Sequence, residues 1–448
     1  MLPVQNSMVD KVPAESINQF YYSSRNTKRS KVDTYQTTNA VFSLNSLTSA
    51  STSTVVISPN SGMSHFILSA SLPEPATAST VAGVNYVGLA LPSGWLYNFI
   101  DNITYRYAGS SQWSATGEQL RVSALVNAGN AQEAQQILNL GGQALLTRAD
   151  FTGSKLSAAI PLTLAHVSSQ SGTSVPLPLD SSLLNGGPIT ITITWKDFSK
   201  VFARTQSAAV APDIISNIPA GFFASTLQIR QIIMMFRDDQ IKMGGDEAYR
   251  YPITFYQPAN QVPLNTTVVG AQTVNLVGFK QGECRGVYCY VTKSYPDTSP
   301  VPQALNRANA STYVAIKRAR MSYAGTVLHD YQSRATGALL DTLYNDSPSY
   351  FQVSSIAAAN PAALGSYWVP AANPLAISYF SHFPFAQRAE DLTDVAFLMN
   401  GVAINNGSIA LEIEIDETFD PLASYVVNYV PYFSAALSFS GGQVDYLF

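Results

Sequence analysis

Hydrophobic and polar residues alternate with a period of two along much of the chain. Isoleucine alternates with threonine over residues 189–193, and Ile or Leu alternates with Ala or Glu over residues 409–415. Successive side chains of a β-strand point to opposite faces of the sheet, so this pattern predicts half-buried antiparallel strands. Many other short segments of this kind are bounded by Gly, Pro, Asn and Ser. The chain therefore belongs to the all-β class, as a sandwich or a barrel.

Helical patterns are few. Residues 130–140 begin with an Asn that can cap a helix and end before two glycines, and residues 333–345 begin with a Ser and place apolar residues three and four apart. Both segments are predicted to be short helices that connect strands.

Three short sequence patterns occur twice, in the same order. The offset is 216 residues (323 − 107) for the first pair and 220 (335 − 115 and 405 − 185) for the other two. The pairs are residues 107–109 and 323–325 (Tyr-Ala-Gly), residues 115–120 and 335–340 (Ala-Thr-Gly-x-x-Leu), and residues 185–193 and 405–413. A period this long exceeds any solenoid repeat, so it predicts duplication of a whole domain.

The domain organisation follows from this duplication. Each copy is expected to form one sandwich, with the boundary between the two domains in the charged, Gly-containing stretch at residues 237–247. We expect an N-terminal arm at residues 1–31, a first sandwich at residues 32–240 and a second at residues 241–448. The strands at residues 189–193 and 409–413 should occupy equivalent places.

Charged residues make up only 12% of the 448 residues, against about 25% in an average soluble domain. Such a surface suits a protein whose neighbours cover much of it. The net charge of −4 gives the whole chain no electrostatic footprint for nucleic acid. Self-association is the favoured use of the surface, and no specific nucleic acid is expected as a partner.

A local basic cluster lies in the N-terminal arm, formed by Arg25, Lys28, Arg29 and Lys31. It is either a solvated tail or an arm that reaches an acidic partner, such as a lipid headgroup surface or a neighbouring subunit. The first residues contain no apolar run long enough for a signal peptide, which argues against classical secretion.

Patterns typical of catalytic and metal sites are missing from the sequence. The four histidines lie at least fifty residues apart, and no P-loop, dinucleotide-binding or serine-nucleophile motif occurs. Alternation puts Cys284 and Cys289 on opposite strand faces, so a disulfide between them would require a bend near Gly286. They are interpreted as two buried or half-buried thiols. Glu412 and Glu414 share one strand face, where a solvated outer surface explains them better than a pair of catalytic carboxylates. We expect no enzyme activity, no metal and no cofactor.

Two tandem all-β units with late alternating strands at residues 176–195 and 385–416 resemble the double jelly-roll major capsid proteins of icosahedral DNA viruses. That lineage includes adenovirus-like, tectivirus-like, virophage and nucleocytoplasmic large DNA viruses. The resemblance implies two tandem eight-stranded antiparallel jelly-roll sandwiches with short connector helices. It also implies homotrimeric, pseudo-hexagonal capsomers that assemble inside the host cell into the shell of the virion.

The partners implied by this resemblance are other copies of the chain, minor capsid and penton proteins, and an internal membrane as a candidate contact of the arm. Two alternatives remain from the sequence. One is a two-domain β-sandwich lectin or adhesin that binds glycans, and the other is a carbohydrate-active enzyme whose carboxylates assemble only in space. A lectin should bind glycan as a monomer, whereas a capsid protein should form a trimer.

Overall fold

The structure is a computed structural model of the full chain. It describes residues 32–43, 51–57, 62–72, 89–91, 93–107, 111–126, 131–143, 145, 153–162, 166–170, 173–176, 179–180, 188–196, 201, 203–204, 228–236, 249–294, 312–314, 316–331, 380–385, 402–404, 409–415, 418–421, 423–440 and 443–447.

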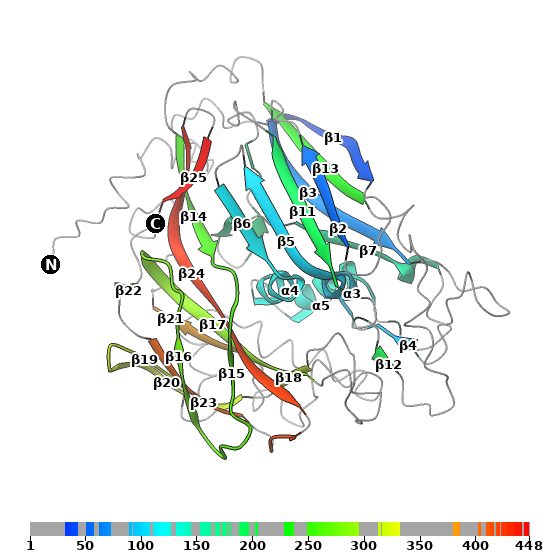
Figure 1. The fold of residues 1–448 in the computed structure, drawn as a ribbon. Coiled ribbons are helices and arrows are strands. Elements are labelled where there is room, and N and C mark those ends of the chain that lie inside the picture. Colours follow the sequence, from blue (N-terminus) through cyan, green and yellow to red (C-terminus); the bar gives the residue numbers. More distant parts are fainter. Residues whose placement is uncertain are drawn as a thin grey trace.

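Two groups of antiparallel sheets lie next to each other (Figure 1). In the first group, a five-stranded sheet has the order β1-β13-β3-β10, with β7 also paired to β3, and a four-stranded sheet has the order β2-β11-β5-β6. A further small sheet pairs β12 with β4. The strands are β1 (Val32–Ser43), β2 (Thr52–Ile57), β3 (Gly62–Ser71), β4 (Leu89–Ala90), β5 (Ile100–Tyr107), β6 (Ser111–Ala115), β7 (Ser157–Pro161), β10 (Leu179–Asp180), β11 (Ile189–Trp195), β12 (Ala203–Arg204) and β13 (Gln228–Phe236).

The second group contains a ten-stranded sheet with the order β18-β17-β24-β14-β8-β9. In this sheet β15 and β25 also pair with β24, and β21 and β22 pair with β17. A four-stranded sheet has the order β16-β23-β19-β20. The strands are β8 (His166–Gln170), β9 (Thr173–Pro176), β14 (Tyr249–Tyr256), β15 (Asn260–Pro263), β16 (Gln272–Leu276), β17 (Glu283–Ser294), β18 (Thr312–Val314), β19 (Ile316–Tyr323), β20 (Thr326–Tyr331), β21 (Phe380–Pro384), β22 (Val402–Ala403), β23 (Ile409–Ile415), β24 (Ser424–Ser440) and β25 (Gln443–Leu447).

The two four-stranded sheets repeat each other strand for strand. In each, the alternating strand predicted from the sequence lies second, between the first strand of its sheet and a hairpin. The register repeats as well: the aligned residues are Ile57, Ile189 and Tyr107 in the first sheet and Leu276, Ile409 and Tyr323 in the second. The prediction that residues 189–193 and 409–413 occupy equivalent strands is confirmed.

The larger sheets repeat each other too. The order β1-β13-β3-β10 in the first sheet matches β14-β24-β17-β22 in the second. Each unit therefore has four matched strands in one sheet and four in the other, which are the eight strands of a jelly roll. The repeated Tyr-Ala-Gly marks a hairpin, because Ala324 and Gly325 have positive φ angles of 47° and 82° between β19 and β20.

The hydrophobic core of each jelly roll lies on the inner faces of its sheets. Strands β11 and β23 show the same pattern, in which each isoleucine or leucine is buried and each intervening residue is half-buried. Burial of one such aliphatic side chain contributes about 1.5–3 kcal/mol. The alternation in the sequence is thus the direct cause of the sandwich geometry.

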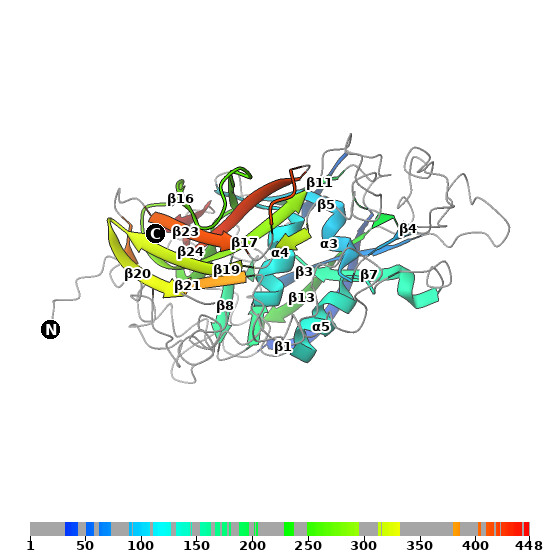
Figure 2. The same cartoon turned by 90° about the horizontal axis from the view of Figure 1, so that it is seen from below.

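Among the residues that the structure describes, the first jelly roll contains three short helices, α3 (Trp95–Phe99), α4 (Gly117–Val126) and α5 (Ala131–Leu140), and the 3₁₀ helix η2 at Gly153–Leu156. Helix α5 confirms the helix predicted at residues 130–140, whereas the one predicted at 333–345 lies outside the described residues. Helices α3 and α4 were not predicted. Figure 2 shows α4 next to the strands of the second roll. No helix in the described part of the chain is long and apolar enough to cross a membrane.

One hairpin crosses from the first half of the sequence to the second. Strands β8 and β9 come before the predicted seam, yet β8 pairs with β14 of the second roll, at Val167 opposite Thr254. The predicted domain boundary at residues 237–247 lies outside the described residues. The strands that flank it, β13 and β14, belong to different sheets.

Candidate functional site

Two buried hydrogen bonds and one partly buried one join the first jelly roll to the backbone of the second. The indole nitrogen of Trp113 on β6 donates to the carbonyl oxygen of Tyr256, at 2.9 Å. The side chain of Gln119 on α4 donates from Nε2 to the carbonyl oxygen of Gln257 and accepts at Oε1 from the amide of Ala259, both at 2.9 Å. Gln119 is only 1% exposed. These contacts define the seam between the rolls.

Gln257 of the second roll fixes the segment whose backbone binds Gln119. Its backbone amide donates to the carbonyl of Pro431, and its Oε1 accepts from the amide of Lys280 at 3.1 Å. Its Nε2 donates to the carbonyl oxygen of Gly278. The segment that follows β14 is therefore fixed by its own hydrogen bonds to β24 and to the loop after β16.

A buried charged cluster lies beside the seam on α4. Arg121 is 1% exposed, donates to Asn98 Oδ1 at 3.2 Å and pairs with both carboxylate oxygens of Glu118 at 3.2 Å. Burial lowers the pKa of Lys196, and the carboxylates of Glu118 and Asp101 partly oppose that shift. A buried charge is costly without a partner, and the guanidinium of Arg121 has partners in Glu118 and Asn98.

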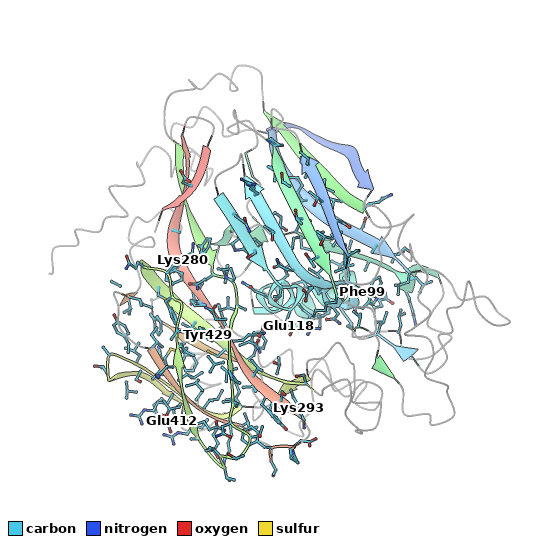
Figure 3. The ribbon with its side chains drawn as sticks, in the orientation of Figure 1. Phe99, Glu118, Lys280, Lys293, Glu412 and Tyr429 are labelled. Atoms are coloured by element: carbon cyan, nitrogen blue, oxygen red, sulfur yellow. The ribbon has the colours of Figure 1, made fainter. Side chains whose placement is uncertain are left out.

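Tyr290 of the second roll lies close to this cluster. Burial raises the pKa of Tyr290 on β17, the negative charge of Glu118 raises it further, and Arg121 opposes the increase. On the same sheet the ring of Tyr432 stacks on Tyr256 at 5.7 Å and on Tyr288 at 5.0 Å between centroids. Figure 3 labels Glu118 on α4, between the sheets of the two rolls. An aromatic, largely uncharged sheet face therefore lies next to the seam.

The sequence contained a signal for α4 that the helix prediction missed. Thr116 precedes the helix, and its hydroxyl accepts from the amide of Gln119 at 3.1 Å, as the first residue of a capping box does. The pattern Thr-x-x-Gln at residues 116–119 could have located the start of the helix. It could not have shown that the Gln119 side chain contacts another domain.

Glu412 and Glu414 lie on the outer face of β23, as predicted, and they are paired with cations. Glu412 lies 3.4 Å from Arg318 and 3.6 Å from Arg320, both on β19, and Glu414 pairs with Lys317. These ion pairs link β23 to the adjacent strand β19 across the outer face of the sheet. The carboxylates therefore serve to join neighbouring strands.

Cys284 and Cys289 are free and buried on β17. Burial raises the pKa of the Cys284 thiol to about 12, and burial raises the pKa of Cys289 as well. The interpretation of these residues as buried thiols is confirmed, and neither is activated as a nucleophile. The expectation that they lie on opposite strand faces is wrong, because a bulge between Cys284 and Gly286 shifts the register and turns both side chains to the same face.

The ring of His329 on β20 stacks on Phe385, with 6.1 Å between centroids. Within the described ranges, no group of three or more His, Cys, Asp or Glu residues could hold a metal ion. The basic cluster of Arg25, Lys28, Arg29 and Lys31 lies outside the described residues.

Two sandwiches with the same strand order in one chain define the class of this fold, a tandem double jelly roll. A scan against protein-family models finds no match, and neither does a search of curated proteins. Solved structures do match over nearly the whole chain. The PBCV-1 virus capsid, in a quasi-atomic model, aligns with a TM-score of 0.54 and 9% identity, covering 93% of this chain and 98% of that chain.

A second solved structure gives the same result. The crystal structure of PBCV-1 VP54, fitted into a cryo-EM reconstruction of the virophage Sputnik, aligns with a TM-score of 0.53 and 10% identity, again over 93% of this chain and 98% of that chain. At such low identity the likeness concerns the fold. It confirms the predicted class of two tandem jelly rolls.

Proposed function

We propose that this chain is a major capsid protein that forms the shell of an icosahedral virion. The observation that carries the proposal is the repeated strand order of the two jelly rolls, together with a likeness of fold to capsid structures over 93% of the chain. Its function is then the symmetric burial of surface and not catalysis. Its location is the virion, after assembly inside the host cell.

The building block of this shell is a homotrimer with a pseudo-hexagonal outline. Each chain supplies two similar sandwiches, from residues 32–240 and 241–448, so that three chains supply six. Six similar units fill a hexagonal lattice position, which favours three copies over other numbers. The low charged fraction of 12% supports extensive contact between copies.

The arm at residues 1–31 faces an acidic partner in this proposal, through Arg25, Lys28, Arg29 and Lys31. An internal membrane and a neighbouring capsomer are its two candidate contacts. Other copies of the trimer, minor capsid proteins and penton proteins complete the set of partners.

Size-exclusion chromatography with light scattering of the full chain tests the proposal. The expected mass at micromolar concentration is three times the 48.2 kDa of one chain. A stable monomer would contradict the proposal. If that monomer also bound a glycan array, the lectin alternative would take its place.

A further inference from the structure

Strand β2 is the edge of its four-stranded sheet on the side away from the second roll (Figure 1). Among the described strands it pairs only with β11, and its register with β11 is unbroken. Successive residues of an antiparallel strand turn their backbone groups alternately to one side and to the other. The outer edge of β2 is therefore open for hydrogen bonding within the part of the chain that the structure describes.

The open backbone groups of β2 belong to Thr52, Thr54 and Val56. The carbonyl oxygen of Ser51 accepts from the amide of Trp195 at 2.9 Å, and the register continues this pairing at every second residue. The three residues in between must then turn their N–H and C=O groups away from β11. Their side chains are exposed as well, that of Val56 by 56%.

Strand β2 lacks the features that usually keep an edge strand from pairing, which are charged residues, prolines and bulges. Its sequence, Thr-Ser-Thr-Val-Val-Ile, contains none of these, and no Asp, Glu, Lys or Arg occurs between Asp33 and Glu74. The edge strand β1 of the same roll differs, because its register with β13 is broken at two places. Of these two edges, β2 is the one suited to accept a further strand.

The outer face beside this edge is uncharged, unlike its counterpart in the second roll. One row of aligned residues across the first sheet carries four hydroxyls, and the equivalent row of the second sheet carries three charges. The rows are Thr54, Thr192, Thr104 and Ser114 in the first sheet, and Thr273, Glu412, Arg320 and Asp330 in the second. Two copies that meet at β2 therefore bring no like charges together in this row.

The seam within the chain leaves the equivalent edge of the second roll exposed. Strand β16 corresponds to β2, and Thr273 and Asn275 on it are exposed although the first roll contacts residues 256–259 nearby. Part of that edge is satisfied internally, since the Tyr429 hydroxyl donates to the carbonyl of Val277 at 2.6 Å and accepts from its amide at 3.0 Å. Among the described residues, no side chain does the same for β2.

We propose that β2 pairs with β2 of a second copy around a twofold axis at Thr54, so that two four-stranded sheets become one sheet of eight strands. The open residues are symmetric about this point, because Thr54 faces Thr54 and Thr52 faces Val56 of the other copy. All three open amides and all three open carbonyls of each strand are then hydrogen-bonded. A contact of this kind is isologous, the same surface serving both copies.

This inference rests on the proposed self-assembly and concerns the contact between trimers, not the contacts within one. Only one strand of six residues takes part from each copy, so the contact is small and weak. Trimers should therefore stay separate in dilute solution and pair through β2 when they are concentrated, as they are in a shell.

Disulfide trapping tests the contact. Thr54→Cys in the full chain places two thiols opposite each other, at a Cα separation that a disulfide spans. The native Cys284 and Cys289 are buried and do not compete. Mild oxidation of concentrated trimer should give a species of twice the 48.2 kDa of one chain, linked from position 54 to position 54. Thr273→Cys, at the equivalent position of β16, is the matched control and should remain unlinked.

The register of the pairing has its own test. A mixture of Thr52→Cys and Val56→Cys chains should form links between positions 52 and 56 of different copies. Thr52→Cys alone should not link, because its two thiols would lie four residues apart along the paired strands. This pattern distinguishes the twofold pairing from a slipped or parallel one.

A charge substitution measures the contact in solution. Thr54→Lys places two lysines directly opposite each other, so the pairing of trimers in sedimentation velocity should weaken at least about tenfold, while the trimer itself persists. Thr273→Lys should leave the pairing as it is in the wild type.

The outcomes separate the two proposals. A wild-type chain that forms no trimer overturns the proposed function, whether or not position 54 links. A trimer in which Thr54→Cys links no faster than Thr273→Cys, or in which Thr54→Lys pairs as the wild type does, overturns the β2 contact alone. Protection of amides 52–56 from hydrogen exchange without a link at position 54 would assign the edge to a different segment, and so would also overturn it.

Discussion

Among single substitutions in the seam, we expect replacement of Gln119 to weaken the contact between the two rolls most. Gln119→Leu keeps most of the volume but removes both hydrogen bonds to the second roll, leaving the carbonyl of Gln257 and the amide of Ala259 unsatisfied. Each unsatisfied buried group costs about 1–3 kcal/mol. The carbonyl of Gln257 is buried but the amide of Ala259 is only half-buried and can bind water, so the substitution should weaken the contact between the rolls by roughly 1–4 kcal/mol.

Hydrogen exchange measured by mass spectrometry reads this effect locally. The amide of Ala259 loses its acceptor, so exchange in the peptide that contains it should accelerate by at least about tenfold, as 1.4 kcal/mol corresponds to a factor of ten. In urea unfolding, the contact between the first and second rolls should be lost at a lower urea concentration in the variant than in the wild-type chain. Gln136→Leu, on an exposed position of α5, is the matched control. Equal stability and equal exchange in the two variants would refute the role given to Gln119.

Further substitutions and conditions test the interior of the rolls and the outer face of β23. Gly142→Ala should lower the free energy of unfolding by more than about 2 kcal/mol, because the φ angle of Gly142 is +119° and a Cβ there would lie 2.2 Å from the indole nitrogen of Trp95. The control Gly153→Ala, with a φ of +60° and open space around it, should cost only about 1 kcal/mol. Thermal unfolding measures both. Cys284 and Cys289 should not react with a thiol reagent at pH 8 before the chain unfolds; rapid labelling of the native protein would contradict their burial. Because the pKa of Cys284 is raised from 9.0 to about 12, its contribution to stability is complete below pH 9 and is lost as the pH rises toward 12, which alkaline urea titrations would detect. Glu412→Gln should cost about 0.5–1 kcal/mol at low salt and less at 1 M salt, and a cost independent of salt would contradict the ion pairs.

The alternating strands and the domain duplication could be predicted from the sequence because both depend on short sequence patterns. Residues 189–193 and 409–413 carry one buried face each, and a period of two in the sequence is enough to state it. The offset of 220 residues then assigned the two strands to equivalent places without any knowledge of the sheets.

The contacts between the two rolls could not be predicted from the sequence in the same way. Gln119 stands where the repeat has Leu339, so the duplication itself gives no sign that its amide contacts the second roll. Strand β8 precedes the predicted boundary but pairs with β14, because the choice of a partner strand is decided by tertiary packing and not by the composition of either strand. Contacts between domains depend on which surfaces remain after each core has formed, which a single sequence does not state.

Electron microscopy of the purified assembly in negative stain tests the central claim most directly. The two jelly rolls of each chain are nearly equivalent, so class averages viewed down the symmetry axis should show six similar lobes in a hexagonal outline with threefold symmetry. Particles with two lobes, or rings with another number of lobes, would contradict the account of this chain as a double jelly-roll capsid tile.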